Sequence, residues 1–512
     1  MSGETYQPGV PETASTFPQF IRAIAAAYGD AVAVRFQDPA LPEETITFAA
    51  LERESARLAR ALLARGAGKG TRIGFIAANS VGFVVQFCAI ARIGAIAVPL
   101  STLLKSHDLV RVLRQSDVTG LIVQRQILGK DYAQRVAEAL PGLYGCAQEL
   151  RLTDVPFLRW VVSDGDDLPQ GVRARSWLLA EAESVDEALL EAVEAEIYPT
   201  DQVMEIYTSG SMAMPKGVKH NHGAVLARTH FLRRKLPLQS GQEYPALMPM
   251  FWVGGLMMYL LPNLAAGAAT LCAEATLRNS RYAMGSVLAE GDEMRPPEGW
   301  PIWALGMTET IGPYSWGDEV RVPGYPLCPP LDHIADGFEV RVADENDQPV
   351  AEGERGEIQV RGYALTPGLH KLEREGYFTA DGYYHTGDMG ERHGERILFV
   401  GRDGDMIKTA SANVSPAEVE QEMQQLEGVH SAYVLGIPDQ ERGQLLVAAV
   451  VPRDGETVEP EALRAALGEC LSSYKVPREY VVISREEVPL LPSNKVARRE
   501  LEVMLAQRLG RA

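Results

Sequence analysis

Buried strands and helices alternate through the first third of the sequence. A helical repeat over 51–62 ends near Gly66, and the apolar segment 72–78 that follows predicts a strand. A second, largely apolar helix is predicted over 81–92 and another strand over 95–99. Strands that are joined through helices lie parallel in one sheet, with the helices covering its faces. The sequence therefore predicts an α/β fold.

The character of the sequence changes near residue 400. A charged, glycine-bearing turn occupies 401–405, and a helix is predicted to follow it. Ser415 is the expected N-cap, Pro416 takes the first helical position, and Glu418 completes a capping box. Short strands then alternate with helices for about a hundred residues, the size of a small domain. We expect a large N-terminal domain of parallel sheets flanked by helices over 1–401, and a small α+β domain over 402–512.

Charge and cysteine usage exclude several classes of protein. The 49 basic and 68 acidic residues give a formal net charge of −19, which repels nucleic acid and anionic lipid. The five cysteines are scattered and form no CxxC pair, a pattern typical of reduced thiols in the cytoplasm. The first twenty residues are polar and lack the pattern of a signal peptide. A cytoplasmic protein that binds no nucleic acid is expected.

One uncharged segment, 246–273, is long enough to cross a bilayer. Pro249, Gly254, Pro262 and Gly267 interrupt it, and such breaks are typical of a buried strand, loop and helix. We therefore expect no membrane span.

A segment rich in hydroxyl residues and glycine, 207–218, is the sharpest chemical signal. Small hydroxyl residues with glycine let backbone amides and hydroxyls surround phosphate oxygens, and a lysine adds charge. The segment is not a Walker A loop, because six residues separate Gly210 from Gly217. A surface turn explains the composition equally well when the segment is taken alone. The candidate phosphate ligands are Thr208, Ser209, Gly210, Ser211 and Lys216.

Two further segments combine a threonine with a carboxylate. In 306–310, Thr308 is placed to contact a phosphate, and Glu309 offers the oxygen ligands that Mg²⁺ prefers. In 385–388, Asp388 is suited to accept two hydrogen bonds from a ribose diol, with Arg402 fourteen residues later to brace it. Taken alone, the first pattern is explained equally well by a solvated helix start, and the second by a loop aspartate. A lone lysine in a loop, such as Lys495, is normally solvated.

In this order, the segments resemble the adenylate-forming superfamily of acyl-CoA synthetases, luciferases and nonribosomal adenylation domains. The resemblance runs from about residue 30 to residue 505. It implies that Thr208, Ser209, Ser211 and Lys216 line the phosphates, Thr308 contacts the α-phosphate and Glu309 holds Mg²⁺. It also implies that Asp388 and Arg402 hold the ribose and that Lys495 bridges the substrate carboxylate and the α-phosphate.

The resemblance further implies a mobile C-terminal domain that rotates between two half-reactions. Gly404 matches the hinge position, and glycine can absorb a large change in φ and ψ. In the second state, the segment 408–414, which begins with Lys408, would line a tunnel for the pantetheine thiol.

The segment 251–255 resembles the part of the family that forms the acyl pocket. Its expected substrate-binding residues are Phe251, Trp252, Gly254 and Gly255. It has no acidic residue to meet an α-amino group, which favours an uncharged aliphatic or aromatic acid. Trp252 could equally be a core tryptophan.

The sequence departs from the family pattern at several positions. Only 51 positions separate Gly255 from Gly306, fewer than the family normally has, and the loop beside the adenine is missing. Leu305 stands where an adenine-stacking tyrosine is common. Smaller departures in the phosphate loop, the tunnel segment and the position before the catalytic lysine are Met212, Ala213, Ser411 and Asn494.

Together these features predict an ATP-dependent carboxylic acid–CoA ligase that uses ATP, Mg²⁺ and coenzyme A. Two alternatives stay open: a ligase that passes the acyl group to a carrier protein or another nucleophile, and a catalytically weak homologue that binds nucleotide or acyl ligand. His220 and His222 share one face of a predicted strand, but a zinc site needs a further ligand. The sequence admits a homodimer without deciding the oligomeric state.

Overall fold

A computed structural model gives the fold of the chain. It describes residues 13–38, 41–145, 150–208, 215–274, 303–317, 331, 333–402, 407–409, 412–414, 416–439, 442–489 and 496–511.

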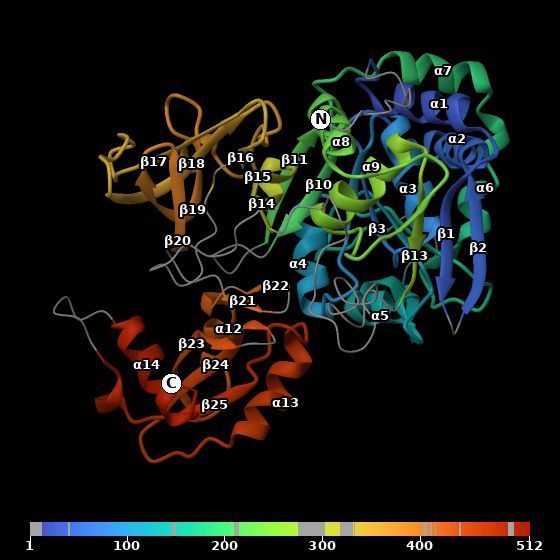
Figure 1. The fold of residues 1–512 in the computed structure, drawn as a ribbon. Helices are drawn as coiled ribbons and strands as arrows, with labels where there is room; N and C mark the ends of the chain where they lie inside the picture. Colours follow the sequence, from blue (N-terminus) through green and yellow to red (C-terminus); the bar gives the residue numbers. More distant parts are fainter. Residues whose placement is uncertain are drawn as a thin grey trace. The chain divides into compact units, whose positions relative to one another are not determined.

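The chain folds into two compact units (Figure 1). The larger unit comprises the described residues within Met1–Thr102, Leu113–Tyr207 and Gly217–Gly401. The smaller unit comprises those within Leu103–Val112, Thr208–Lys216 and Arg402–Ala512.

A seven-stranded sheet forms the centre of the larger unit. Its order is β11-β10-β4-β3-β5-β8-β9, and the neighbours from β10 to β9 pair in parallel. The parallel arrangement confirms the predicted α/β class, and the predicted strands at 72–78 and 95–99 correspond to β3 and β4. The strands are β3 (Arg72–Ile76), β4 (Ile96–Pro99), β5 (Gly120–Val123), β8 (Trp160–Ser163), β9 (Val172–Ala174), β10 (Gln202–Thr208) and β11 (Lys216–Asn221).

Helices cover this sheet, and α1, α2 and α3 pack against one another (Figure 1). The α3 helix has the predicted bounds, Val81–Arg92, and the Ser80 side chain caps it by accepting a hydrogen bond from the Phe83 amide at 3.2 Å. Almost all of α3 is buried, as its apolar sequence predicts. The other helices of the larger unit are α1 (Phe17–Tyr28), α2 (Phe48–Ala64), α5 (Tyr132–Ala139), α6 (Arg175–Leu179), α7 (Glu187–Ala195), α8 (His222–Lys235) and α9 (Leu261–Ala266). The α4 helix (Ser106–Ser116) is divided between the units, with its residues up to Val112 in the smaller one.

A second sheet has the order β12-β13-β1-β2, with β13 parallel to β12 and β1. The uncharged segment 246–273 supplies a π-helix, η3 (Gly255–Leu260), which continues into α9, and then β13. None of the described helices has both the length and the apolar character needed to cross a bilayer. The strands are β1 (Val32–Asp38), β2 (Leu41–Thr47), β12 (Glu243–Pro245) and β13 (Ala269–Cys272).

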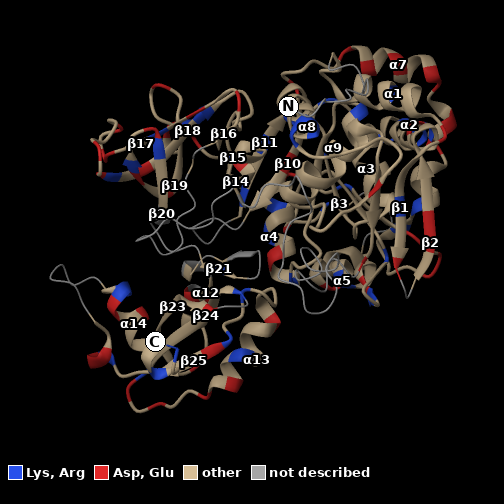
Figure 2. Cartoon of the chain, in the orientation of Figure 1, with Lys and Arg blue, Asp and Glu red and all other residues tan. Residues whose placement is uncertain are grey.

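Two antiparallel sheets complete the larger unit. One has the order β14-β15-β16 and the other β17-β18-β19-β20, which carries both acidic and basic residues (Figure 2). The strands are β14 (Trp303–Met307), β15 (Gly312–Gly317), β16 (His333–Ile334), β17 (Phe338–Ala343), β18 (Arg355–Gly362), β19 (Tyr384–His393) and β20 (Arg396–Arg402). The remaining short elements are β6 (Gln126–Ile127), β7 (Lys130–Asp131), η1 (Pro141–Gly145), η2 (Ala182–Ser184), η4 (Thr308–Thr310) and η5 (Arg374–Gly376).

The smaller unit is an α+β layer structure. Its sheet has the order β22-β21-β24-β23, and β25 pairs with β24. Along β24, Leu446, Ala448 and Val450 belong to one core cluster, and the alternate residues belong to a second one. The first cluster is covered by α12 and α13, and the second by α14. The elements are β21 (Ile407–Thr409), β22 (Ala412–Val414), α12 (Pro416–Gln424), β23 (Val429–Asp439), β24 (Gly443–Pro452), α13 (Pro460–Cys470), β25 (Glu479–Val482), η6 (Arg485–Glu487) and α14 (Arg498–Arg508).

Pro416 begins α12, as the sequence predicts. The expected N-cap Ser415 and the side chain of Glu418 lie outside the described part of the chain. The expected hinge Gly404 also lies outside it.

Candidate active site

The Gly-x-Thr-Glu motif, residues 306–309, forms a tight turn between β14 and β15. Residues Thr308–Thr310 make a single 3-10 turn, and Ile311 then adopts a left-handed φ of 53°. The Thr310 hydroxyl accepts a hydrogen bond from the Met307 amide at 3.1 Å and donates to the Gly312 carbonyl at 2.7 Å. These bonds brace the turn, so that Thr308 and Glu309 are held by the fold of the hairpin.

Glu309 is buried and is held by a distant tyrosine. The Tyr384 hydroxyl donates a hydrogen bond to Glu309 Oε1 at 3.1 Å, across 75 positions of sequence. Tyr384 begins β19, the strand that carries the Thr-Gly-Asp motif at residues 386–388. The structure therefore joins two of the motifs that the sequence presents separately.

The Thr-Gly-Asp motif lies in a bulge of β19. The register of β18 against β19 shifts between Glu357 and Gln359, opposite residues 386–388. Gly387 adopts a φ of 69°, and its amide donates to Glu357 Oε1 at 2.8 Å. The Asp388 amide donates to the Thr386 hydroxyl at 3.0 Å. A bulge turns a side chain away from its regular direction, and here it determines where buried Asp388 points.

A segment that contains none of the sequence motifs links Glu309 to the strand after the phosphate loop. The Thr366 amide donates to the Glu309 carbonyl at 2.7 Å, and the Thr366 hydroxyl donates to the Lys219 carbonyl at 2.8 Å. Val218 and Leu369 form a β-bridge beside these bonds. The sequence does not reveal this segment, because nothing in its composition marks it as part of a site.

The acyl-pocket motif begins the π-helix η3. Asn79, at the end of the β3–α3 connection, holds the preceding loop by accepting from the Met250 amide at 2.8 Å and donating to the Met248 carbonyl at 2.9 Å. Phe251 is buried edge-on against partly exposed Trp252, with 5.4 Å between ring centroids. A Cβ atom on Gly312 would lie 3.6 Å from the Met257 Cβ, so η3 neighbours the Gly-x-Thr-Glu turn. π-Helical turns are frequent at functional sites.

Several of the expected site residues are not in this cluster. Arg402 and Lys408 belong to the smaller unit, as do the loop-end residues Thr208 and Lys216. Leu305 lies on β14 and is partly exposed. The expected positions that lie outside the described residues are Ser209, Gly210, Ser211, Met212, Ala213, Ser411, Asn494, Lys495 and most of the shortened segment, over 275–302, together with the side chain of Arg402.

A magnesium ion fits the chemistry of Glu309, which offers hard carboxylate oxygens. In the described ranges, no group of three His, Cys, Asp or Glu side chains could hold a metal by itself. An ion at Glu309 would therefore need further oxygen ligands from phosphates and water.

His220 and His222 are buried parts of the core. Burial lowers the pKa of His220 to about 3, and the neighbouring backbone of Thr308 opposes this shift. Burial likewise lowers the pKa of His222 to about 4. His222 Nδ1 accepts a hydrogen bond from the Phe17 amide at 3.2 Å, which is a structural role.

These two histidines predict a loss of stability in acid. An unfolded histidine takes up a proton near pH 6.5, whereas buried His220 stays neutral to about pH 3. Their stabilising contribution is full above pH 6.5 and is lost as the pH falls below it. When the pH falls from 7 to 4.5, the free energy of unfolding should decrease less in His220→Leu than in the wild type. We expect the two decreases to differ by about 2–3 kcal/mol. Urea unfolding at both pH values measures this difference.

The control is His333→Gln, because His333 is exposed and should leave the pH dependence unchanged. Equal pH dependence in the wild type and in His220→Leu would contradict the assignment.

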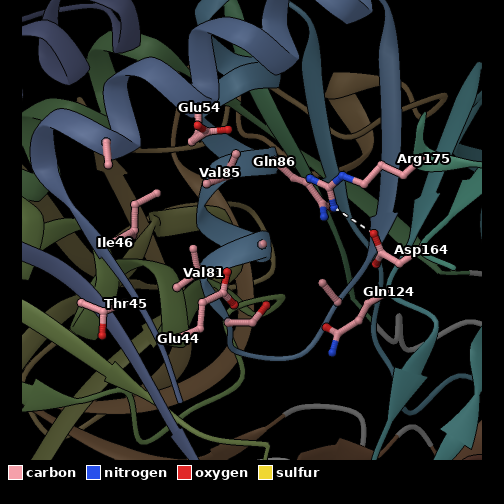
Figure 3. A pocket seen from close by; sticks show the side chains of 14 residues that line it. Glu44, Thr45, Ile46, Glu54, Val81, Val85, Gln86, Gln124, Asp164 and Arg175 are labelled. Atoms are coloured by element: carbon pink, nitrogen blue, oxygen red, sulfur yellow. Dashed lines mark hydrogen bonds and ion pairs between the residues drawn. The ribbon is translucent and has the colours of Figure 1, made fainter. Parts of the chain in front are cut away.

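A cavity of about 580 Å³ opens at the carboxyl ends of β3, β5, β8 and β9. Arg175 and Asp164 pair at 3.4 Å on one side of it, and Glu44 and Ile46 line the other (Figure 3). None of the expected site residues lines this cavity.

Comparison with known proteins gives the family. Residues 21–289 match the model of the AMP-binding enzyme family, and residues 418–495 match that of the AMP-binding enzyme C-terminal domain. The chain is 27% identical to the feruloyl-CoA synthase of an Amycolatopsis species, over 89% of this chain and 93% of that protein. It is 25% identical to the fatty acid–[acyl-carrier-protein] ligase ScoC of Streptomyces coeruleorubidus, over 89% and 91%.

Among solved structures, o-succinylbenzoate-CoA synthetase of Bacillus subtilis shares the fold with a TM-score of 0.69. The alignment covers 94% of this chain and 98% of that one, at 21% identity. The family match spans more than half of this sequence, and the relatives match it nearly from end to end. The chain therefore belongs to the AMP-binding enzyme family and is a ligase of the adenylate-forming class.

Proposed function

We propose that the chain is an ATP-dependent carboxylic acid–CoA ligase. In the first half-reaction, a carboxylate oxygen of the substrate attacks the α-phosphorus of ATP and pyrophosphate leaves. In the second, the thiol of coenzyme A attacks the acyl carbon and AMP leaves. The observation that carries the proposal is the hydrogen bond from Tyr384 to Glu309, which joins the Gly-x-Thr-Glu and Thr-Gly-Asp motifs within a chain of this family.

The proposed roles follow the motifs. Glu309 would hold Mg²⁺, which when bound withdraws negative charge from the phosphates. Thr308 would contact the α-phosphate from the braced turn, and Asp388 would hold the ribose diol from its bulge. Thr208, Ser209, Gly210, Ser211 and Lys216 would surround the phosphates, Arg402 would brace the ribose, Lys495 would bridge carboxylate and phosphate, and Lys408 would face the pantetheine.

An uncharged aliphatic or aromatic acid fits the acyl motif best. Phe251 and Trp252 offer apolar ring surfaces, and the motif 251–255 brings no carboxylate that could bind an ammonium group. The similarity to a feruloyl-CoA synthase agrees with an aromatic acid.

The relatives of this chain differ in the acceptor of the acyl group that their names give. The similarity to ScoC, which is named as an acyl-carrier-protein ligase, favours a carrier protein as the second candidate. The shortened segment between Gly255 and Gly306 favours a third candidate, a weakly active homologue that binds nucleotide or acyl ligand.

ATP–pyrophosphate exchange with a panel of aliphatic and aromatic acids tests the first half-reaction. We expect exchange that depends on Mg²⁺ and on one class of acid. AMP release that depends on coenzyme A then separates the CoA ligase from the carrier-protein ligase. Nucleotide binding without exchange across the whole panel would contradict the enzyme and favour the weakly active homologue.

A further inference from the structure

A cluster of charged and polar side chains around a buried glutamate lies at the two ends of the candidate phosphate loop. Its centre is Glu205 on β10, whose carboxylate is completely buried. Glu205 accepts hydrogen bonds from the Tyr207 hydroxyl at 2.6 Å, from Gln202 Nε2 at 3.2 Å and from Arg72 Nε at 3.3 Å. A buried carboxylate is costly unless it is paired and hydrogen-bonded, and here both conditions are met.

The cluster continues through His370. Arg72 donates to His370 Nδ1 at 3.2 Å, and His370 Nε2 lies 3.2 Å from Asp117 Oδ2. A guanidinium can only donate and an ionised carboxylate can only accept, so the proton of the neutral ring is on Nε2. Lys371 pairs with Asp117 at 2.6 Å.

Two members of the cluster, Tyr207 and His370, have shifted pKa values. Burial and the Glu205 carboxylate raise the pKa of Tyr207, so its hydroxyl stays a donor. Burial lowers the pKa of His370, so its ring stays neutral. Glu205 pairs with Arg72 and Asp117 pairs with Lys371, so removal of Arg72 would leave the buried Glu205 carboxylate poorly compensated.

The cluster involves both residues that flank the loop, Tyr207 and Gly217. Tyr207 is the residue before Thr208, and Gly217 is the residue after Lys216. A Cβ atom on Gly217 would lie 2.7 Å from both Glu205 Oε1 and the Tyr207 hydroxyl oxygen. The Tyr207–Glu205 pair therefore packs directly against the backbone at the far end of the loop and sets the distance between its two ends.

The cluster is also tied to Glu309. The His370 amide donates to the Gly217 carbonyl at 2.7 Å, and the Lys219 amide donates to the Gly368 carbonyl at 3.3 Å. At the other end of this segment, the Thr366 amide donates to the Glu309 carbonyl. Residues 366–371 thus form a short bridge between the loop end and the turn that carries Glu309.

We propose that Tyr207 and Glu205, held by Arg72 and His370, are positioning residues that fix both ends of the phosphate loop and couple them to Glu309 through residues 366–371. The inference rests on the proposed function, because the loop must bind the phosphates of ATP. Because the loop would hold the triphosphate, substitutions in the cluster should weaken the binding of ATP and leave the binding of the carboxylic acid unchanged.

Tyr207→Phe is the mildest test, since it removes only the hydroxyl. We expect the KM for ATP in pyrophosphate exchange to rise about tenfold, the effect of losing one hydrogen bond to a charged group, with the KM for the acid unchanged. Glu205→Gln should raise the KM for ATP at least as much. A higher concentration of the acid should not restore the exchange rate of either variant. Saturating ATP should bring both rates closer to that of the wild type.

The matched controls remove the same groups elsewhere. Tyr28→Phe removes a hydroxyl that donates to the Ala265 carbonyl at 3.2 Å. Glu194→Gln removes a buried charge that pairs with Arg92 at 2.5 Å. Both should lower the unfolding temperature and leave the KM for ATP unchanged. If Tyr207→Phe and Glu205→Gln behave like these controls, the cluster only stabilises the fold and the proposal is overturned.

Calorimetric titration with ATP in the absence of any acid separates this proposal from the proposed function. If the wild type binds ATP but exchanges no pyrophosphate with any acid, the ligase assignment fails, while a tenfold weaker Kd for ATP in Tyr207→Phe still supports the positioning role. A wild-type chain that binds no ATP overturns both.

Discussion

Glu309→Gln is expected to lower the rate of acyl-adenylate formation by on the order of 10²-fold, as the loss of a preorganised charge in an active site does. Glutamine has nearly the same shape and can still accept the hydrogen bond that Tyr384 donates at 3.1 Å. The turn over Thr308–Thr310 is braced through Thr310, so its backbone should not move. What is lost is the negative charge that would hold Mg²⁺ on the phosphates.

Pyrophosphate exchange at a series of Mg²⁺ concentrations measures this effect. We expect part of the lost rate to return at high Mg²⁺, because the ion is still bound by ATP. Tyr384→Phe keeps the charge and removes only its hydrogen bond, so it should cost clearly less than Glu309→Gln. If the rate in Glu309→Gln is unchanged at low Mg²⁺, Glu309 does not hold the ion.

Lys495→Ala is expected to lower adenylation by on the order of 10²-fold or more. The substrate carboxylate and the triphosphate are both anionic and repel each other as the new bond forms. A cation between them offsets the repulsion and stabilises the additional negative charge on the pentacoordinate phosphorus.

The second half-reaction provides the internal control for Lys495→Ala. When a synthetic acyl-adenylate is supplied, no carboxylate has to approach ATP, so thioester formation with coenzyme A should proceed at nearly the wild-type rate. Lys130→Ala removes an exposed lysine on β7 and should change neither half-reaction. Pyrophosphate exchange at the wild-type rate in Lys495→Ala would refute the role of this lysine.

Local signals in the sequence were sufficient for much of the secondary structure. The α3 helix has its predicted bounds because its start depends on the adjacent cap, Ser80. Its burial follows from a run in which Gln86 is the only polar residue before Arg92. Such signals act over one or two turns of chain and need no knowledge of the rest.

The uncharged segment 246–273 shows where local signals are insufficient. Its prolines and glycines indicate breaks, and the structure has them, but the sequence did not predict that Gly255–Leu260 form a π-helix. That conformation adds about one residue to a helical turn, and no pattern of neighbouring residues in the segment indicates it.

The sequence by itself determined the α/β class, the order of the motifs and the residue types that an adenylate-forming ligase requires. Only the tertiary structure decided that Tyr384 reaches Glu309, that Asp388 sits in a bulge, and that residues 366–371 connect the loop end to the turn that carries Glu309. Caps and periodic patterns are properties of neighbouring residues, which the sequence displays directly. Hydrogen bonds between residues far apart in the sequence depend on how whole strands pack, and no local pattern encodes them.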